Sequence, residues 1–157
     1  MGRFFAIAIP VFILGFGAGA AFWYLASPLF FDDVVSESLA SDALKATRTG
    51  TFRDADRAHK GTGTATIFED ASGKAVLRFT EFEVTNGPDL EVWLVAEPDP
   101  KSSKDVKEST FLSLGQLKGN VGDQNYDIPE GTDLAQYGSV VIWCEQFGVL
   151  FSPAMLN

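Results

Sequence analysis

The chain opens with a long block of uncharged residues, most of them apolar, that runs from Phe4 to Phe31. A helix needs roughly 20 apolar residues to cross the hydrocarbon core of a bilayer, and this block is long enough. Trp23 and Tyr24 stand near its end, where amphipathic aromatic rings favour the membrane–water interface. The pattern therefore predicts a transmembrane helix from about Phe4 to Ala26.

The charges on either side of the block predict its orientation. Arg3 precedes it and Asp32-Asp33 follows it, and positive charge tends to stay cytoplasmic. We therefore expect a single-pass protein of the cell membrane whose C-terminal part is extracytoplasmic. A cleaved signal peptide is the alternative, with Ala18-Gly19-Ala20 as its small-residue cleavage site. We favour a retained anchor, because Pro28-Leu29-Phe30-Phe31 continues the apolar run without a polar break.

Residues 32–49 differ from the block before them and from the segment after them. Their apolar positions recur at near-helical spacing, which predicts one or two helical turns. These positions are Val34, Val35, Leu39, Ala43 and Leu44. We therefore divide the chain into a membrane anchor or uncleaved signal at 1–31, a partly helical connector at 32–49 and a β domain at 50–157.

From Gly50 onward, apolar and polar residues alternate with a period of two, which is typical of β-strands. Turn clusters separate the segments, among them the strong turn signal Asn86-Gly87-Pro88-Asp89. In that turn we expect Gly87 to adopt a positive φ and Asp89 to bond to the turn's own backbone. The predicted strands lie near residues 61–68, 75–80, 90–96, 111–117, 125–128, 140–144 and 148–151.

The segments 90–96 and 140–144 are apolar on nearly every position, so we expect them to be central, buried strands. We expect Phe79, Val92, Leu94, Val140 and Ile142 in the core. Seven or eight short strands with no long helical pattern between them predict an all-β, antiparallel sandwich or barrel. A sandwich is favoured, because several strands carry apolar side chains on both faces.

The charge of the chain excludes one class of partner. Twelve basic and 21 acidic residues give a net charge of −9, and without Arg3 the remainder carries 11 − 21 = −10. Nucleic acid requires Lys and Arg to neutralise its phosphates, so we expect no nucleic-acid binding. An anionic membrane surface would also repel this domain.

Cys144 is the only cysteine, so an intrachain disulfide and a cysteine-rich zinc site are excluded. A lone thiol in an oxidising compartment is buried, liganded or paired with another chain. On an extended strand its side chain points the same way as Val140 and Ile142 and opposite to Trp143. Its residue type is compatible with a small buried hydrophobe and with a metal-bound or haem-bound thiolate.

His59 is the only histidine, and it stands in a polar loop before the first strong strand. It is either a hydrogen-bonded loop residue or a ligand or proton carrier. A self-contained blue-copper site needs two histidines and is excluded. The pattern for covalent haem attachment is absent, while a haem held by Cys144, His59 or Met155 is compatible with the inventory of side chains. Asp54 and Asp56 alone are weak evidence for a cation site.

Several blocks together resemble the DM-thirteen domain family, a small β domain found beside DOMON domains and labelled as an electron-transfer domain. The resemblance covers about residues 48–156. It is carried by His59-x-Gly61-x-Gly63, Asn86-Gly87-Pro88-Asp89-Leu90, Leu114-x-x-Leu117-Lys118-Gly119 and Val140-Val141-Ile142-Trp143-Cys144.

The resemblance implies an all-β fold and a redox role in which Cys144 acts as a bare thiol or as a ligand of a prosthetic group, haem among the candidates. No DOMON or cytochrome domain is fused to the chain, so its electron donor would be a separate redox protein or a membrane component. We therefore expect a redox module rather than an enzyme with its own substrate. The alternative is a non-catalytic binding domain at the cell surface in which Cys144 is structural. The cofactor, any metal and the oligomeric state stay open.

Overall fold

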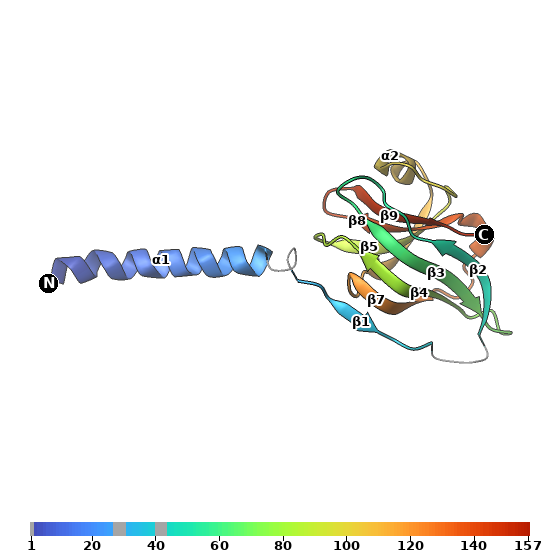
Figure 1. Cartoon of the computed structure of the whole chain (residues 1–157), viewed down its shortest axis with the longest axis horizontal. Coiled ribbons are helices and arrows are strands. Elements are labelled where there is room, and N and C mark those ends of the chain that lie inside the picture. The colour runs from blue at the N-terminus through green and yellow to red at the C-terminus, as the bar shows by residue number, and fades with distance from the viewer. Residues whose placement is uncertain (1, 27–30, 40–43) are drawn as a thin grey trace. The chain divides into compact units, whose positions relative to one another are not determined.

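The computed structural model describes residues 2–26, 31–39 and 44–157, with the side chains of the first helix described from 7 to 23. The chain divides into two units, residues 1–31 and 32–157 (Figure 1). The first unit contains helix α1 (Gly2–Ala26), whose extent is close to the helix predicted from the apolar block. The second unit contains all the described strands.

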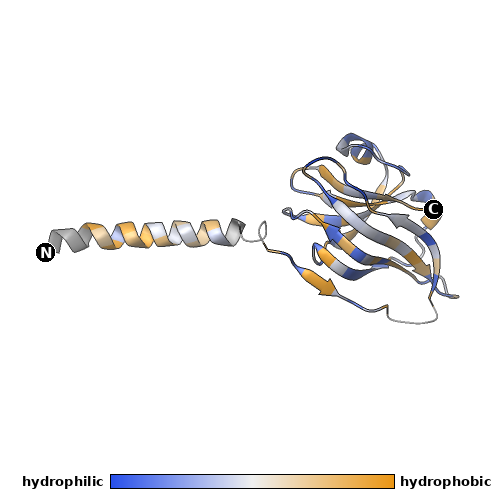
Figure 2. Ribbon diagram, viewed as in Figure 1, coloured by the Kyte–Doolittle hydropathy of each residue, from blue (hydrophilic) through white to orange (hydrophobic). Residues whose placement is uncertain are grey.

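The described side chains of α1 are uncharged, and large apolar ones such as Ile9, Leu14 and Phe22 are more than half exposed. Figure 2 shows hydrophobic residues along the part of α1 that it colours. Within the described residues, however, no helix is long and apolar enough to cross a membrane. The structure therefore confirms a helix here but does not support the prediction that it is a transmembrane span. The glycines and alanines of residues 15–21 contribute little apolar surface to the helix.

The second unit is built from two β-sheets (Figure 1). One sheet has five strands in the order β1 (Val34–Ser36), β7 (Val121–Ile128), β4 (Ala75–Val84), β3 (Gly61–Glu69) and β2 (Lys45–Thr51). The other has four strands in the order β6 (Phe111–Gln116), β5 (Leu90–Val95), β8 (Ser139–Cys144) and β9 (Val149–Met155). Every pairing is antiparallel except that of β1 with β7. A short helix α2 (Ser103–Lys107) and a 3₁₀ turn (Leu134–Gln136) lie in the loops.

The predicted all-β, sandwich-like fold is confirmed. Strands β5 and β8 lie in the interior of the four-stranded sheet, as their two apolar faces predicted. The five side chains expected in the core have no exposed surface: Phe79, Val92, Leu94, Val140 and Ile142.

The segment that we interpreted as a partly helical connector contains one strand and most of another. Val34 and Val35 belong to β1, and residues 45–51 form β2. β1 pairs with β7, where an added Cβ on Gly122 would lie 2.0 Å from the Val35 carbonyl oxygen, so only glycine admits this close approach. Of the five apolar positions that suggested helical spacing, Val34 and Val35 lie in β1, whereas Leu39 and Leu44 lie outside both strands. Residues 40–43, which include part of the predicted helical turn, lie outside the described residues.

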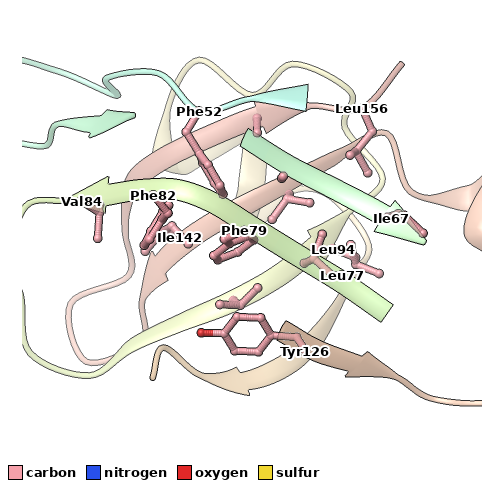
Figure 3. Close-up of a cluster of buried hydrophobic side chains, with 14 of the residues drawn as sticks. Phe52, Ile67, Leu77, Phe79, Phe82, Val84, Leu94, Tyr126, Ile142 and Leu156 are labelled. Atoms are coloured by element: carbon pink, nitrogen blue, oxygen red, sulfur yellow. The ribbon is translucent and has the colours of Figure 1, made fainter. Parts of the chain in front are cut away.

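The core fills the space between the two sheets, and Figure 3 shows Phe79, Phe82, Leu94 and Ile142 converging from strands of both. A second apolar cluster covers the outer face of the four-stranded sheet beneath α2. It consists of Trp93, Val95, Val106, Val141, Trp143 and Leu150. Because successive residues of a strand point to opposite faces, β8 presents Cys144 to the inner core and Trp143 to the outer cluster.

Candidate functional site around Cys144

Cys144 is the last residue of β8, and its side chain is completely buried in the inner core. It pairs with Leu90 of β5 and Val149 of β9, so a strand lies on each side of it. The thiol donates a hydrogen bond to the carbonyl oxygen of Pro88, with 3.1 Å between sulfur and oxygen. The turn that contains Pro88 therefore covers the sulfur at this end of the sheet.

The turn at residues 86–89 owes its shape to two residues, but not in the way that the sequence predicted. Asp89, rather than Gly87, adopts a positive φ of 52°. Gly87 is needed for space, since an added Cβ would lie 2.6 Å from two ring carbons of Phe151. The Asp89 carboxylate accepts a hydrogen bond from the Gln116 side chain across to the end of β6. Phe151 thus packs directly against the turn that holds the partner of the Cys144 thiol.

The ring of His59 packs against the ring of Phe151, with 4.3 Å between the two ring centroids. Its Nδ1 is 2.8 Å from Oδ2 of Asp56, whose Oδ1 accepts hydrogen bonds from the backbone N–H groups of Ala58 and His59. These bonds, that with the His59 ring foremost, lower the pKa of Asp56 to about 2. The imidazole is therefore fixed by a carboxylate on one edge and by an aromatic face.

The structure brings His59 and Cys144 to the same part of the domain without joining them directly. Phe151 contacts the His59 ring and the Gly87 backbone, and the next residue, Pro88, accepts the Cys144 hydrogen bond. We call these residues (His59, Gly87, Pro88, Cys144 and Phe151) the Cys144 cluster.

Met155, the third candidate ligand, does not belong to the Cys144 cluster. It pairs with Ser139 at one end of β8, whereas Cys144 pairs with Val149 at the other end. Cys144 lies five positions after Ser139 along the strand, a distance of about 17 Å at roughly 3.4 Å per residue. Met155 and Cys144 therefore cannot ligate one iron together in this fold.

The acidic residues before β3 are occupied by their own loop. Asp54 accepts hydrogen bonds from Nζ of Lys60 at 2.7 Å and from the backbone N–H of Gly61 at 3.1 Å. These bonds, that with Lys60 foremost, lower the pKa of Asp54. Within the described residues, no group of three or more His, Cys, Asp or Glu side chains is placed to hold a metal ion. Asp54 and Asp56 thus shape the loop that carries His59.

The family model described as electron transfer DM13 matches residues 51–156. The chain belongs to the electron transfer DM13 family. Comparisons with curated proteins and with solved structures found no match. The match spans the strands from β3 to β9 and includes every residue of the Cys144 cluster, so the family resemblance predicted from the sequence is confirmed.

The packing of the DM13 domain decides whether the candidate ligands face space for a haem or a metal. Three pockets on the described part of the chain have volumes of about 430, 290 and 230 Å³, and none of these three is lined by Cys144, His59 or Met155. The sulfur is enclosed by strands and by the Pro88 turn. As packed here, the residues around Cys144 do not fit a haem, and we derive no step through one.

The outer face of the same sheet carries aromatic residues that our sequence analysis did not single out. The rings of Phe111 and Trp93 are stacked with 3.8 Å between centroids and 6° between planes, and Trp143 stacks on Trp93 at 5.2 Å. The Trp93 indole N–H donates to Glu91 at 2.7 Å, and that of Trp143 donates to Glu145 at 3.2 Å. The available signal was a glutamate two residues from a tryptophan, within one predicted strand (Glu91 and Trp93) and at the end of another (Trp143 and Glu145), because residues two apart on a strand share a face.

Proposed function

We propose that this DM13 domain is an electron-transfer module whose redox-active side chain is Cys144. The family to which the chain belongs is described as electron transfer, which supports a redox role for the domain as a whole. The observation that carries the assignment to Cys144 is the hydrogen bond from its thiol to Pro88. This contact links the only thiol of the chain, whose side chain lies in the inner core, to a half-buried turn.

The cover over the sulfur is a turn rather than a strand, and this supports access by local opening. Asn86, Gly87 and Pro88 are half-buried, and Asp89 is exposed. Loops and turns open at a lower free-energy cost than core strands. Opening at residues 86–89 would break the hydrogen bond to Pro88 and expose the sulfur, while β5, β8 and β9 keep their pairing. Cys144 would then react with a disulfide of a separate redox protein, forming a mixed disulfide and releasing one thiol of that protein.

The second candidate function is a binding domain in which Cys144 is only a packing residue. Complete burial of the side chain within the inner core favours this alternative. Free cysteine commonly behaves as a small buried hydrophobe. The two functions predict different properties for a variant that lacks the thiol. A redox role predicts that the redox reaction is lost, whereas a packing role predicts only a loss of stability.

The experiment that tests the proposal is an anaerobic titration of the full-length chain in buffers of glutathione and glutathione disulfide, beside Cys144→Ser and Ser152→Ala. Ser152 is a buried residue of β9 whose hydroxyl donates a hydrogen bond to the Arg53 carbonyl, so its variant is a control for lost buried polar contacts. In these buffers a reactive Cys144 forms a mixed disulfide with glutathione and releases one glutathione thiol, and we expect this reversible reaction in the wild type and in Ser152→Ala but not in Cys144→Ser. A reaction that persists in folded Cys144→Ser would refute the role of Cys144.

A visible spectrum and a metal analysis of the same preparation, purified from native-like expression, test for a prosthetic group. A haem or copper–thiolate absorbs in the visible, whereas a thiol does not. We expect the thiol reaction without a visible chromophore, because the Cys144 side chain is completely buried and its thiol is bonded to the Pro88 carbonyl. A stoichiometric chromophore that is lost in Cys144→Ser would show that the packing around the sulfur rearranges to admit a ligand.

We also propose that the chain acts at the cell membrane, with the DM13 domain on the extracytoplasmic side and a separate redox protein as its partner. The exposed, uncharged apolar side chains along α1 support attachment to an apolar phase. Membrane fractionation followed by N-terminal sequencing tests this proposal. Recovery in the membrane pellet with residue 1 or 2 first supports it, whereas a soluble product that begins near Ala21 shows cleavage.

A further inference from the structure

We propose that Trp93, backed by Trp143, is a one-electron donor site on the outer face of the four-stranded sheet. This site is separate from Cys144 and does not depend on it. Its parts are the stacked rings of Phe111, Trp93 and Trp143 and the carboxylates of Glu91 and Glu145.

The partner of the Trp93 indole suits an indole that loses an electron. Oxidation leaves a positive charge on the ring and makes its N–H acidic. The Glu91 carboxylate accepts that N–H at 2.7 Å, so it stabilises the positive charge and can take the proton. The same Oε2 accepts a hydrogen bond from Oγ of Ser113 at 2.7 Å, which fixes the carboxylate in position.

A buried indole N–H needs a hydrogen-bond partner in any protein, and a neutral carbonyl would satisfy it. Here both buried indoles of the sheet use a carboxylate instead, and each carboxylate belongs to a residue two positions away on the same strand or its end. Packing alone does not require a negative charge at either ring. The repeated choice of a carboxylate is the observation that points beyond packing.

The charges around the two indoles differ, and the difference favours Trp93 as the oxidised ring. Nζ of Lys107 lies 5.8 Å from the centre of the Trp143 ring, where a cation opposes a second positive charge. The bond from Trp143 to Glu145 is also longer, at 3.2 Å. Trp143 therefore supports Trp93 by stacking, while the electron vacancy resides on Trp93.

The site is connected to the surface by one ring. Trp93 is only 5% exposed, whereas Phe111, stacked on it at 3.8 Å, is 47% exposed. An oxidant in contact with Phe111 is thus separated from Trp93 by the thickness of a benzene ring. Burial of the indole also keeps water from the radical.

The step balances with a one-electron oxidant of the metal-complex class, such as a ferric haem, a cupric site or a ruthenium(III) polypyridyl. The oxidant gains one electron, Trp93 loses one, and the Nε1 proton passes to the Glu91 carboxylate. Return of an electron from a reductant brings the proton back to the indole. No bond between heavy atoms forms or breaks.

The test uses the full-length chain with Trp23→Phe as the parent, so that Trp93 and Trp143 are its only indoles. A ruthenium(III) polypyridyl generated by a light flash is the oxidant, and transient absorption measures the yield of the indole radical and distinguishes it from a tyrosine radical. Adding Trp143→Phe, which leaves Trp93, should preserve most of the yield. Adding Trp93→Phe, which leaves Trp143, should lower it at least about tenfold.

Charge variants keep the test valid if a tryptophan variant fails to fold. Glu91→Gln retains both rings and a hydrogen-bond acceptor but removes the charge, so we expect at least about a tenfold loss of radical yield. Lys107→Met should raise the yield from Trp143 in the chain without Trp93, and Lys104→Met is its control because Lys104 pairs with Glu108. Equal yields from the two single-indole chains, or an unchanged yield in Glu91→Gln, would overturn the proposal. Neither result bears on the reaction of the Cys144 thiol.

Discussion

Replacement of Cys144 tests the geometry of the thiol most directly. Sequence reasoning alone expects a buried serine hydroxyl at this position to lack a partner, at a cost of about 1–3 kcal/mol. The structure supplies an acceptor, since the Pro88 carbonyl oxygen lies 3.1 Å from the sulfur. Two buried serines also donate to backbone carbonyl groups: Ser139 of β8 to that of Glu97 and Ser152 of β9 to that of Arg53, each at 2.7 Å.

We therefore expect Cys144→Ser to lower the free energy of unfolding by about 1 kcal/mol, mainly through the loss of apolar burial of the sulfur. Cys144→Ala should cost about 2 kcal/mol, because it removes an atom from a filled site and also leaves the Pro88 carbonyl without its donor. Serine should thus be the milder replacement, which is the reverse of the expectation for a hydroxyl in a wholly apolar site.

Urea unfolding, followed by the fluorescence of Trp93 and Trp143, measures these differences. Ser152→Ala serves as the control, and we expect it to cost about 1 kcal/mol through one lost hydrogen bond. A loss of more than about 3 kcal/mol in Cys144→Ser, together with a smaller loss in Cys144→Ala, would show that the Pro88 carbonyl does not accept from residue 144.

Two further predictions concern the rest of the Cys144 cluster. Gly87→Ala should lower the free energy of unfolding by about 1–3 kcal/mol, because the new Cβ would lie 2.6 Å from the Phe151 ring; urea unfolding at wild-type stability would contradict this contact. The Asp56 carboxyl should titrate at about 2 by NMR, and its stabilising contribution, present above its usual pKa of 3.8, should be lost as the pH falls through about 2. His59→Ala should raise that pKa toward 3.8, and an unchanged value would show that the imidazole is not its main partner.

The central strands could be predicted because their signal is local. Alternation over residues 90–95 and 140–144 placed Val92, Leu94, Val140 and Ile142 on one face, and both faces proved to be buried. The side on which Cys144 lies also followed from this alternation, since residues two apart on a strand share a face.

Strands β1 and β2 could not be predicted in the same way, because neither carries a clear alternation of apolar and polar residues, so only their pairing with other strands reveals them. Val34 pairs with Val121, and Thr49 pairs with Thr66. A strand of three residues carries too little alternation to be distinguished from a helical turn. Gly122, whose missing side chain allows β1 to pair with β7, looks like an ordinary turn residue in the sequence.

The geometry of the site was hidden for a similar reason. The acceptor for the Cys144 thiol is a backbone carbonyl 56 residues away. Every residue has such a carbonyl group, so the residue type does not indicate which one accepts the bond. The role of Gly87 was misassigned because glycine serves either a positive φ or a close approach, and only the position of Phe151 decides between them.

Strand β8 places two oxidisable side chains one peptide bond apart but in opposite surroundings. The Cys144 thiol faces a neutral carbonyl beneath a turn, so its reaction with a partner requires the turn to open. The Trp143 indole and its neighbour Trp93 face carboxylates and adjoin an exposed ring, so an electron can leave Trp93 with the fold closed. Alkylation of Cys144 should therefore accelerate in Gly87→Ala, where the turn is strained, while the radical yield at Trp93 stays constant. If the alkylation rate and the radical yield both rose in Gly87→Ala, both reactions would depend on opening of the turn at residues 86–89, and the two faces of the sheet would not act separately.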